Sequence, residues 1–389
     1  TGMREAVIVD AVRTPVGRRN GRLSDMHAVD LAALTLQALV ERNGLDPERV
    51  DDVIMGCVGQ TGEQSANIGR NALLAAGWPE SVPAVTIDRQ CGSSQQAAHF
   101  AAQGVMAGVY DIAIAAGIEH MTRIPMGINM TQGPGFPFPP SLQERYLPTG
   151  LVPQGLSAEM VAERWELGRE ELDGYAYDSH MRAHRATLEG RFADEIVPIE
   201  ITADDGTELM TADEGIRPGT SLEKLAALKP AFKEDGVITA GNSSQISDGA
   251  AAVLIMGRDT AEAMGMRPRA RFVSFAVVGV DPVSMLTGPI PATGKALERA
   301  GLSLGDIDRF EVNEAFSSVI GAWLKETGAP WSQTNVNGGA MANGHPLGAS
   351  GAKLMTTLVH ELEHSGARYG LQTMCEGGGL ANATILERL

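Results

Sequence analysis

A single cysteine stands between a short apolar run and an alanine-rich segment. Residues 84–87 read as a strand, Cys91 follows, and residues 93–106 have the alanine and glutamine content of a helix. This order places Cys91 at a helix N-terminus, where unpaired backbone N–H groups and the helix dipole favour an anion. We therefore expect Cys91 to have a lowered pKa and to act as a nucleophile. The alternative is a buried cysteine that only fills space, as a lone cysteine often does.

A second group of polar residues lies in the C-terminal third. Asn313 follows an apolar run, His345 stands in the glycine-rich loop 335–351, and Cys375 comes just before Gly377. Glycines at this density let backbone approach a ligand closely, and a histidine beside a thiol can take its proton. Asn313 alone is typical of a helix N-cap, and Cys375 alone would more often be structural. Two cysteines and a histidine, each beside glycines, are hard to explain by packing and indicate a catalytic site.

These residues need a scaffold, and the hydrophobic pattern predicts alternating strands and helices. Strands are expected over 6–11, 50–58, 111–117 and 249–255, and helices over 30–42, 67–76 and 352–362. Such alternation is typical of an α/β fold. It is interrupted between about 122 and 241 by proline- and glycine-rich turns and by two helices over 157–191, which indicates an inserted domain.

The last third of the chain repeats the first. The sequence Glu-Arg-Asn-Gly-Leu at 41–45 matches Glu-Arg-Ala-Gly-Leu at 298–302, and the strand at 111–117 falls against residues 370–374. The match is weak residue by residue, but its order and spacing are kept. It predicts two related α/β halves packed together, with the active site between them.

Composition and charge argue against several classes of protein. The chain has 389 residues, enough for two or three domains, and a formal charge of −17, which argues against nucleic-acid binding. Its three cysteines are far apart, so neither a disulfide framework nor a zinc site is indicated. No apolar run is long enough to span a membrane, and residues 3–11 lack the features of a secretory signal. We therefore expect a soluble cytoplasmic protein.

The segments around these polar residues resemble those of the thiolases, the acetyl-CoA C-acyltransferases, and the likeness covers essentially the whole chain. The matching segments, in family order and spacing, are Cys91-Gly92-Ser93, Asn313-Glu314-Ala315-Phe316, the glycine-rich loop with His345, and Cys375 with Gly377-Gly378-Gly379. The resemblance implies an α/β, thiolase-like fold in which two related halves form an α-β-α-β-α arrangement with an inserted loop domain. The expected parts are an N-terminal half (3–121 and 245–270), a CoA-binding lid or loop domain (122–244) and a C-terminal half (271–389).

The resemblance also implies roles in the CoA-dependent cleavage of 3-ketoacyl-CoA to acetyl-CoA and a shortened acyl-CoA. Cys91 would carry the acyl group as a thioester, with ping-pong kinetics, and His345 would activate it. His345 and a water held by Asn313 would form one oxyanion hole, and the backbone N–H groups of Cys91 and Gly377 a second. Cys375 would be the acid and base for the α-proton of acetyl-CoA. CoA is a co-substrate here, and neither a permanently bound cofactor nor a metal is implied.

A segment in the middle of the chain resembles the family's CoA-binding segment. Arg217 would lie beside the adenine and phosphates of CoA, with Lys224 a weaker candidate. Phe232, Ala240 and Ser244 would line the pantetheine channel. The alternative is an ordinary solvated surface, because exposed lysines are common.

Two departures from the family pattern bear on the substrate. Short-chain biosynthetic thiolases usually have a histidine near the position of Pro153, and a proline there is similar to degradative thiolases. The sequence is also similar to actinobacterial thiolases, including those that act on steroid side chains, so we expect a degradative enzyme of β-oxidation type. Glu376 replaces a small or apolar residue, and could raise the pKa of Cys375 or face away.

The sequence leaves two other functions open besides that of a degradative thiolase. A short-chain acetyl-CoA acetyltransferase that makes acetoacetyl-CoA is the main alternative, and a non-catalytic thiolase-like carrier is an alternative of another class. A decarboxylating ketoacyl synthase would lack a cysteine equivalent to Cys375, and a carrier should have lost one of the reactive residues, but none is lost. The family implies a homodimer or homotetramer. The acyl chain, the physiological direction and the choice between these oligomers are left open.

Overall fold

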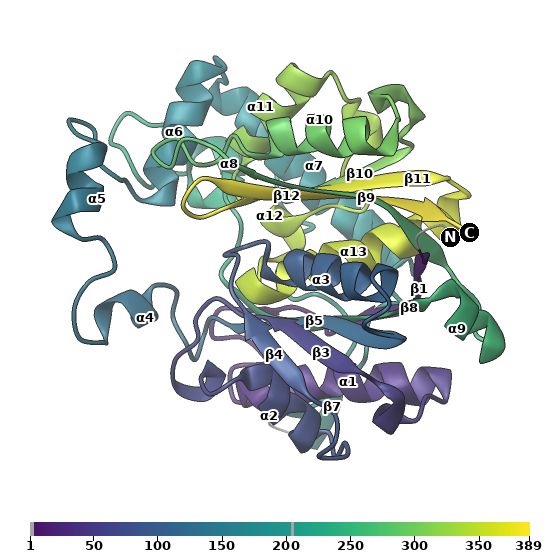
Figure 1. Ribbon diagram of the computed structural model, residues 1–389. Helices are drawn as coiled ribbons and strands as arrows, with labels where there is room; N and C mark the ends of the chain where they lie inside the picture. Colours follow the sequence, from purple (N-terminus) through teal and green to yellow (C-terminus); the bar gives the residue numbers. More distant parts are fainter. Residues whose placement is uncertain (1–3, 204–205) are drawn as a thin grey trace.

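The computed structural model describes residues 4–203 and 206–389, and its main strands form two stacked layers with helices between and outside them (Figure 1). Residue 3, where the predicted N-terminal half begins, lies outside the described residues. So do residues 204 and 205 in the predicted loop domain.

The first layer combines strands from the start of the chain with one strand from beyond the insertion. Its strands, in spatial order, are β4 (Ala84–Ile87), β3 (Asp52–Gly56), β5 (Ile112–His120), β8 (Ser247–Gly257) and β1 (Ala6–Arg13), and β2 (Gly17–Arg18) pairs with β8. Strand β3 is parallel to β4 and β5, whereas β8 is antiparallel to β5 and β1. Strands β1, β5 and β8 are buried along their whole length, which explains their uninterrupted apolar sequences.

The second layer repeats this arrangement with the C-terminal strands. Its strands, in spatial order, are β10 (Arg309–Val312), β11 (Tyr369–Glu376), β12 (Leu380–Arg388) and β9 (Ala270–Gly279). Strand β10 is parallel to β11, and β12 is antiparallel to both β11 and β9. A short antiparallel contact between β1 and β9 joins the two layers into one continuous sheet.

Helices fill the space between the two layers and cover their outer faces (Figure 1). Helices α3 (Ser93–Met106) and α13 (Leu347–Ser365) form the central layer. The outer helices are α1 (Ala28–Asn43) and α2 (Ile68–Ala75) on the first layer, and α10 (Pro289–Ala300) and α11 (Ser317–Thr327) on the second. Helix α9 (Arg258–Ala263) leads from β8 to β9, and α12 (Ala340–Asn343) precedes α13. The predicted α-β-α-β-α fold class is therefore confirmed.

The two central helices approach closely because small residues lie where they cross. A Cβ atom on Gly351 of α13 would be 2.1 Å from the backbone nitrogen of Gln95 in α3. The N–H of Ala352 donates to Ser94 Oγ at 2.8 Å across the same crossing. The glycine and alanine content of the chain is thus used to bring the two helix N-termini into one region.

The predicted repeat appears as the same local structure in both halves. Helix α1 ends at Gly44 and α10 ends at Gly301, and both glycines are left-handed, with φ of 56° and 65°. In each case the glycine N–H donates to carbonyl groups of the last turn, which closes the helix. The matching sequences at 41–45 and 298–302 are therefore equivalent helix ends.

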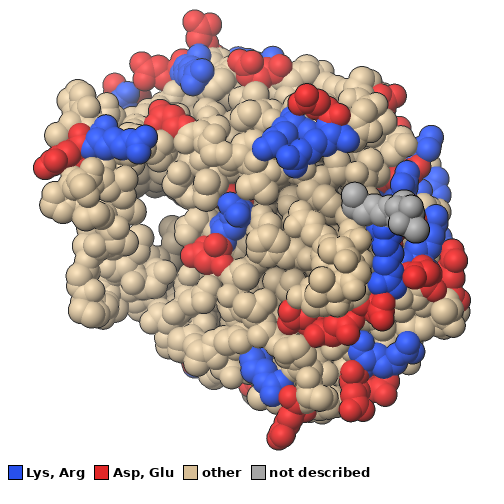
Figure 2. Space-filling view, in the orientation of Figure 1, with Lys and Arg blue, Asp and Glu red and all other residues tan. Residues whose placement is uncertain are grey.

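The inserted segment holds the two predicted helices and several shorter elements. These are α4 (Ile128–Thr131), α5 (Pro140–Arg145), α6 (Gln154–Arg164), α7 (Arg169–Leu188), β6 (Ile199–Ala203), β7 (Gly206–Met210) and α8 (Leu222–Ala226). The arm that carries α4 and α5 stands away from the body, and Figure 2 shows an open gap beside it. The rest is tied to β1 by buried Arg13, which pairs with Glu195 at 2.6 Å and with Asp213 at 2.7 Å. The predicted boundaries of the three parts stay a prediction.

Candidate active site

Cys91 lies in the loop between β4 and α3, two residues before the first helical residue. Its side chain is buried beside Leu347 at the start of α13 and Met374 in β11. The loop therefore presents the thiol to the second half of the molecule. This is the strand-to-helix position that the sequence predicts for it.

The ionisation of Cys91 differs from the prediction. Burial and the nearby Glu376 carboxyl raise the pKa of Cys91 to about 12, although the N–H groups of Cys91 and Gly377 and the Gln154 side chain favour its thiolate. The expected lowered pKa is therefore wrong for the ligand-free site. The two N–H groups favour the thiolate, but their contribution is smaller than the cost of placing a charge among apolar side chains. The resting Cys91 side chain is therefore a neutral thiol.

His345 stands two residues before α13 and is fixed on both sides of its ring. Its Nδ1 lies 2.5 Å from Ser350 Oγ, and its Nε2 lies 3.3 Å from Asn313 Nδ2. The Ser350 hydroxyl donates to Pro346 O at 2.8 Å, so its oxygen is left to accept from Nδ1–H. That assignment leaves Nε2 without a proton, as the acceptor from the Asn313 amide.

The charge state of His345 follows from its surroundings. Burial, together with the nearby cation Lys353, lowers the pKa of His345 to about 3. Lys353 is itself buried in α13 and donates to Asn343 Oδ1 at 2.7 Å, which fixes the loop just before His345. The imidazole is therefore neutral near pH 7 and free to take a proton on Nε2.

The remaining predicted catalytic residues come from the ends of two parallel strands. Asn313 follows β10, and its N–H donates to Thr373 O at 3.0 Å. The N-cap of the next helix is Phe316, so the alternative interpretation of Asn313 as an N-cap is wrong. Cys375 lies near the end of β11, and Gly377 begins the turn that follows.

Cys375 is close enough to Cys91 for the two thiols to influence each other. Burial and the charges of Cys91 and Glu376 raise the pKa of Cys375 well above its usual value. The effect of Glu376 has the direction that the sequence suggested. A buried thiol that keeps its proton at neutral pH has the property required of a proton donor.

Two neighbouring side chains of this site were not predicted. Gln154 lies at the start of α6, and its side chain lies close enough to the Cys91 sulfur to favour the thiolate. Ser350 lies in α13 and orients His345. His345 lies outside the helix and five residues from Ser350, which is not a helical i, i+3 or i, i+4 spacing, so periodicity gave no signal for this contact. Gln154 comes from the inserted segment and had no such signal either.

A cavity of ≈ 290 Å³ opens beside the insertion. It is lined by His180, Arg217, Gly219, Thr220, Lys224, Leu225, Leu228, Ala240, Gly241, Gln245 and Met341. Three of the predicted CoA contacts, Arg217, Lys224 and Ala240, are among these residues. The Lys224 ammonium donates to Gly219 O at 2.6 Å, and the exposed Arg217 has no ion-pair partner among the residues that the structure describes. The cavity therefore offers cations at its edge and apolar side chains inside.

The other two predicted CoA contacts lie outside this cavity. Phe232 is 43% exposed and packs edge-on against Phe316, with ring centroids 6.0 Å apart. The N–H of Ser244 donates to Ala315 O at 2.9 Å. Both therefore lie beside the segment that follows Asn313.

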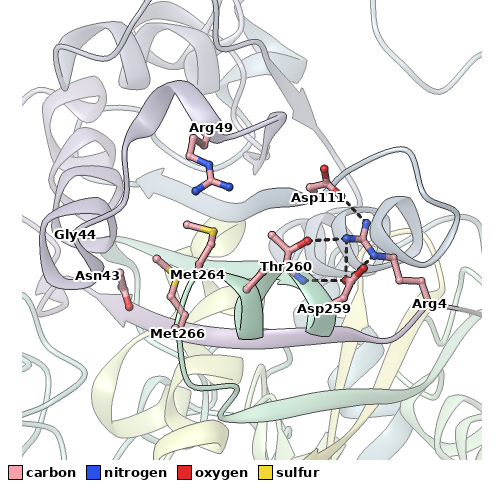
Figure 3. A pocket seen from close by; sticks show the side chains of 11 residues that line it. Arg4, Asn43, Gly44, Arg49, Asp111, Asp259, Thr260, Met264 and Met266 are labelled. Atoms are coloured by element: carbon pink, nitrogen blue, oxygen red, sulfur yellow. Dashed lines mark hydrogen bonds and ion pairs between the residues drawn. The ribbon is translucent and has the colours of Figure 1, made fainter.

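A larger hollow of ≈ 750 Å³ lies at the opposite end of the sheet and contains none of the predicted site residues (Figure 3). Arg4 at its edge is held by Asp111 at 2.8 Å and by Asp259 at 2.9 Å. These contacts join the amino ends of β1 and β5 to α9. The hollow is therefore separate from the candidate active site.

Comparison with known proteins identifies the family. Residues 6–259 match the model for the thiolase N-terminal domain, and residues 266–388 match the thiolase C-terminal domain. The chain belongs to the thiolase family. The match covers both repeated halves, so the predicted resemblance is confirmed.

The chain aligns with named relatives along essentially its whole length. It is 50% identical to the steroid 3-ketoacyl-CoA thiolase FadA6 of Mycobacterium tuberculosis, over 100% of this chain and 95% of that protein. It is 46% identical to the 3-ketoacyl-CoA thiolase of Aliivibrio fischeri, over 99% and 100% of the two chains. The crystal structure of the Bacillus anthracis acetyl-CoA acetyltransferase superposes with a TM-score of 0.91 at 39% identity, covering 100% of this chain and 99% of that one. These relatives are acyltransferases, and this chain is one also.

Neither a membrane-spanning helix nor a cluster of metal ligands is found among the described residues. No helix within residues 4–203 and 206–389 has the length and apolar character needed to cross a membrane. In the same residues, no group of three or more histidine, cysteine, aspartate or glutamate side chains is placed to hold a metal ion.

Proposed function

We propose that this thiolase cleaves 3-ketoacyl-CoA with CoA to give acetyl-CoA and a shortened acyl-CoA, and that Cys91 carries the acyl group. The observation that carries the proposal is the neutral His345, whose Nδ1 is held by Ser350 and whose Nε2 carries no proton and faces the Asn313 amide. The names of relatives at 46% and 50% identity support the same reaction.

The first half-reaction forms the acyl-enzyme. His345 Nε2 takes the proton of Cys91, and the sulfur attacks the 3-keto carbon of the substrate. The N–H groups of Cys91 and Gly377 hold the resulting alkoxide. Its collapse breaks the bond between C2 and C3 and expels the enolate of acetyl-CoA. In such sites one oxyanion-hole donor lowers the activation barrier by about 3–4 kcal/mol.

The enolate needs its own stabilisation and a proton. His345, now protonated, and a water held by the Asn313 amide hold the enolate oxygen. Cys375 donates its proton to the enolate carbon, and acetyl-CoA leaves. The raised pKa of Cys375 supports this role, because the thiol still carries its proton when the carbanion forms.

The second half-reaction releases the product and restores both cysteines. The CoA thiol gives its proton to the Cys375 thiolate and attacks the acyl carbon on Cys91. The tetrahedral intermediate collapses, the shortened acyl-CoA leaves, and the Cys91 sulfur recovers its proton from His345. Two substrates thus react in turn at one sulfur, which is the origin of ping-pong kinetics.

CoA binds in the cavity beside the insertion in this proposal. Arg217 and Lys224 meet the phosphates and adenine at its edge, and Ala240 lines the entrance to the pantetheine channel. Phe232 and Ser244 contact the pantetheine further along, towards Asn313. The charged and apolar parts of the cavity match the charged and apolar parts of CoA.

The substrate is a 3-ketoacyl-CoA longer than acetoacetyl-CoA in this proposal. Support comes from Pro153 at the position of the histidine that short-chain biosynthetic thiolases usually have. The main alternative is an acetyl-CoA acetyltransferase, which is the name of the structural neighbour at 39% identity. The degradative function is preferred because relatives of higher identity are named 3-ketoacyl-CoA thiolase.

The proposal also includes an oligomeric state and a cellular compartment. The arm with α4 and α5 exposes the apolar side chains of Met126, Phe136 and Leu147, by 62%, 60% and 66%, which favours contact between copies in a homodimer or homotetramer. All three cysteines are free, which suits the reducing cytoplasm. Light scattering of the purified protein measures the oligomer, and cell fractionation measures the compartment.

The test of the proposal is the thiolysis rate for a panel of 3-ketoacyl-CoAs, from acetoacetyl-CoA through long-chain to ring-bearing substrates. We expect kcat/KM to rise with acyl size, and a radiolabelled acyl group to be trapped on the peptide that contains Cys91. High activity with acetoacetyl-CoA alone would overturn the degradative assignment. Absence of label on Cys91 during turnover would overturn the mechanism.

A further inference from the structure

Glu376 is the last residue of β11 and follows Cys375 directly. Successive side chains of a strand point to opposite faces, so Glu376 points away from Cys375 and towards α3. Its carboxyl group packs against Gly92, the N-cap of that helix, and a Cβ atom at position 92 would lie 1.8 Å from Glu376 Oε1. The carboxyl group therefore lies directly behind the loop that carries Cys91.

The environment of this carboxyl group is unusual. Glu376 is fully buried, and neither of its oxygens has a hydrogen-bond partner within the described part of the chain. Asn382, on the neighbouring strand β12, donates to Gly92 O at 3.1 Å, and its own Oδ1 also has no partner there. The region behind the nucleophile thus contains several acceptors without a hydrogen-bond partner, and Arg89 Nε, a donor, also has none among the described residues.

A second buried glutamate in the equivalent half shows what a site for a charged carboxylate looks like. Glu119, near the end of β5, accepts from the N–H groups of Val58, Gly59 and Gly348 at 2.8–2.9 Å, and from the Gln64 amide at 2.9 Å. These donors favour the ionised form of Glu119 and oppose the effect of burial, which still raises its pKa. No hydrogen bond from the described residues favours the ionised form of Glu376 in the same way, so its surroundings favour the neutral acid, whose O–H can itself donate.

The charged and titratable groups around Glu376 come from two elements, the loop between β4 and α3 and strand β11. Arg89 in the loop after β4 favours its ionised form, and Asp88 in the same loop opposes it. Cys91, before α3, and Cys375, on its own strand, would each repel a charge on Glu376 when ionised. Burial outweighs the single cation, and it raises the pKa of Glu376 well above its usual value.

We propose that Glu376 is a positioning residue that holds a proton behind the two reactive cysteines and thereby controls how readily Cys91 ionises. The proposal rests on the proposed role of Cys91 as nucleophile. While Glu376 is neutral, the proton of Cys91 passes to His345 without opposition from a neighbouring charge. Once Glu376 is ionised, its charge opposes the thiolate at Cys91.

The sign of the pH effect follows from this arrangement. Raising the pH increases the thiolate fraction of Cys91, but it also ionises Glu376, which pushes the pKa of Cys91 upwards. The alkylation rate of Cys91 should therefore increase less steeply at high pH than that of an isolated thiol. In Glu376→Gln the second effect is absent, because an amide has a similar shape and cannot ionise.

The experiment measures the alkylation of Cys91 by iodoacetamide over a range of about pH 6 to 10, with each cysteine-containing peptide quantified by mass spectrometry. We expect E376Q to alkylate Cys91 about tenfold faster than the wild type at the alkaline end, equivalent to a decrease of one pKa unit, with a smaller difference at pH 7. Glu311→Gln is the matched control, because Glu311 is also buried in this sheet, on β10, and has no effect on Cys91.

Coinciding pH profiles for E376Q, E311Q and the wild type would overturn the proposal. A uniformly faster reaction of E376Q at every pH would also overturn it, because Glu376 would then be charged in the resting enzyme. Glu376→Met provides a second variant with the same expected profile if E376Q does not fold. Thiolysis is measured in parallel: a shifted profile in a chain without thiolase turnover would sustain the role of Glu376 and reject the proposed function.

Discussion

The two halves of this thiolase share one scaffold but place different chemistry at equivalent points. Cys91 stands two residues before α3, and His345 stands two residues before α13. In our proposal, one half alone would present a thiol without its base, or a base without its thiol. The close packing of α3 on α13 would then bring the two together as a catalytic pair.

The two halves also differ in the surroundings of their buried glutamates, Glu119 in the first half and Glu376 in the second. Glu119 is surrounded by hydrogen-bond donors, one of them Gly348 from the other half, whereas the carboxyl group of Glu376 has no hydrogen-bond partner among the described residues. The first half thus uses its carboxylate to fix loops. In our proposal, the second half uses its carboxyl group to influence the chemistry of its neighbours.

The largest expected effect is the loss of the nucleophile from the first half. Cys91→Ala removes the only atom in our mechanism that can carry the acyl group, so kcat should decrease at least about 10⁴-fold. Thiolysis of a 3-ketoacyl-CoA measures this loss. Cys57→Ala is the control, because Cys57 is buried in a different cluster and should leave kcat unchanged. Equal effects of the two substitutions would contradict a specific role for Cys91.

The next effect tests the base from the second half. His345→Ala should decrease kcat about 10³-fold, because no other group takes the proton from Cys91. In the wild type the lowered pKa of His345, about 3, means that the base stays unprotonated down to acidic pH. The acidic limb of kcat/KM should therefore lie well below about pH 6.5, the ordinary value for histidine. A limb at that ordinary value would contradict the burial argument.

A third prediction concerns the contact between the halves. Gly351→Ala puts a Cβ atom against the backbone of α3, and it should lower the free energy of unfolding by about 2 kcal/mol. Gly294 in α10 has nothing within 4 Å of its hypothetical Cβ, so Gly294→Ala should stabilise by about 0.5–1 kcal/mol. Chemical denaturation measures both values. A stable G351A protein would show that the crossing tolerates separation.

A smaller effect should follow from loosening His345 without removing it. Ser350→Ala deletes the acceptor for Nδ1–H, and we expect kcat to decrease about tenfold while KM changes little. Thr356→Val is closely matched, because its hydroxyl lies six residues further along the same helix and donates to Ala352 O at 2.8 Å. Steady-state kinetics of the pair would separate orientation of the imidazole from general destabilisation of α13.

The smallest effect concerns CoA binding. Arg217→Ala should raise KM for CoA about threefold with kcat unchanged, because a single exposed cation contributes little. Arg49→Ala is the control, since Arg49 is exposed at the separate hollow shown in Figure 3. The difference should decrease at high salt, which screens the interaction with phosphate. An equal change in both variants would argue against CoA in the cavity beside the insertion.

Local sequence determined the elements and their repetition. The strand at 84–87, the helix at 93–106 and the equivalent helix ends at Gly44 and Gly301 follow from apolar periodicity and glycine stop signals. These features depend on neighbouring residues, so they can be read from a single chain. The motifs around the cysteines and His345 also indicated the family correctly.

The tertiary structure determines the charge state of the Cys91 thiol and the side chains that surround it. The pKa of Cys91 is raised, against the prediction, because Leu347, Met374 and Glu376 close around it from distant parts of the chain. Gln154 reaches the same sulfur from the inserted segment, and no local pattern announces that contact. The helix dipole is a local property and could be predicted from the sequence. Burial is a property of the whole fold, and here it has the larger effect on the charge of the nucleophile.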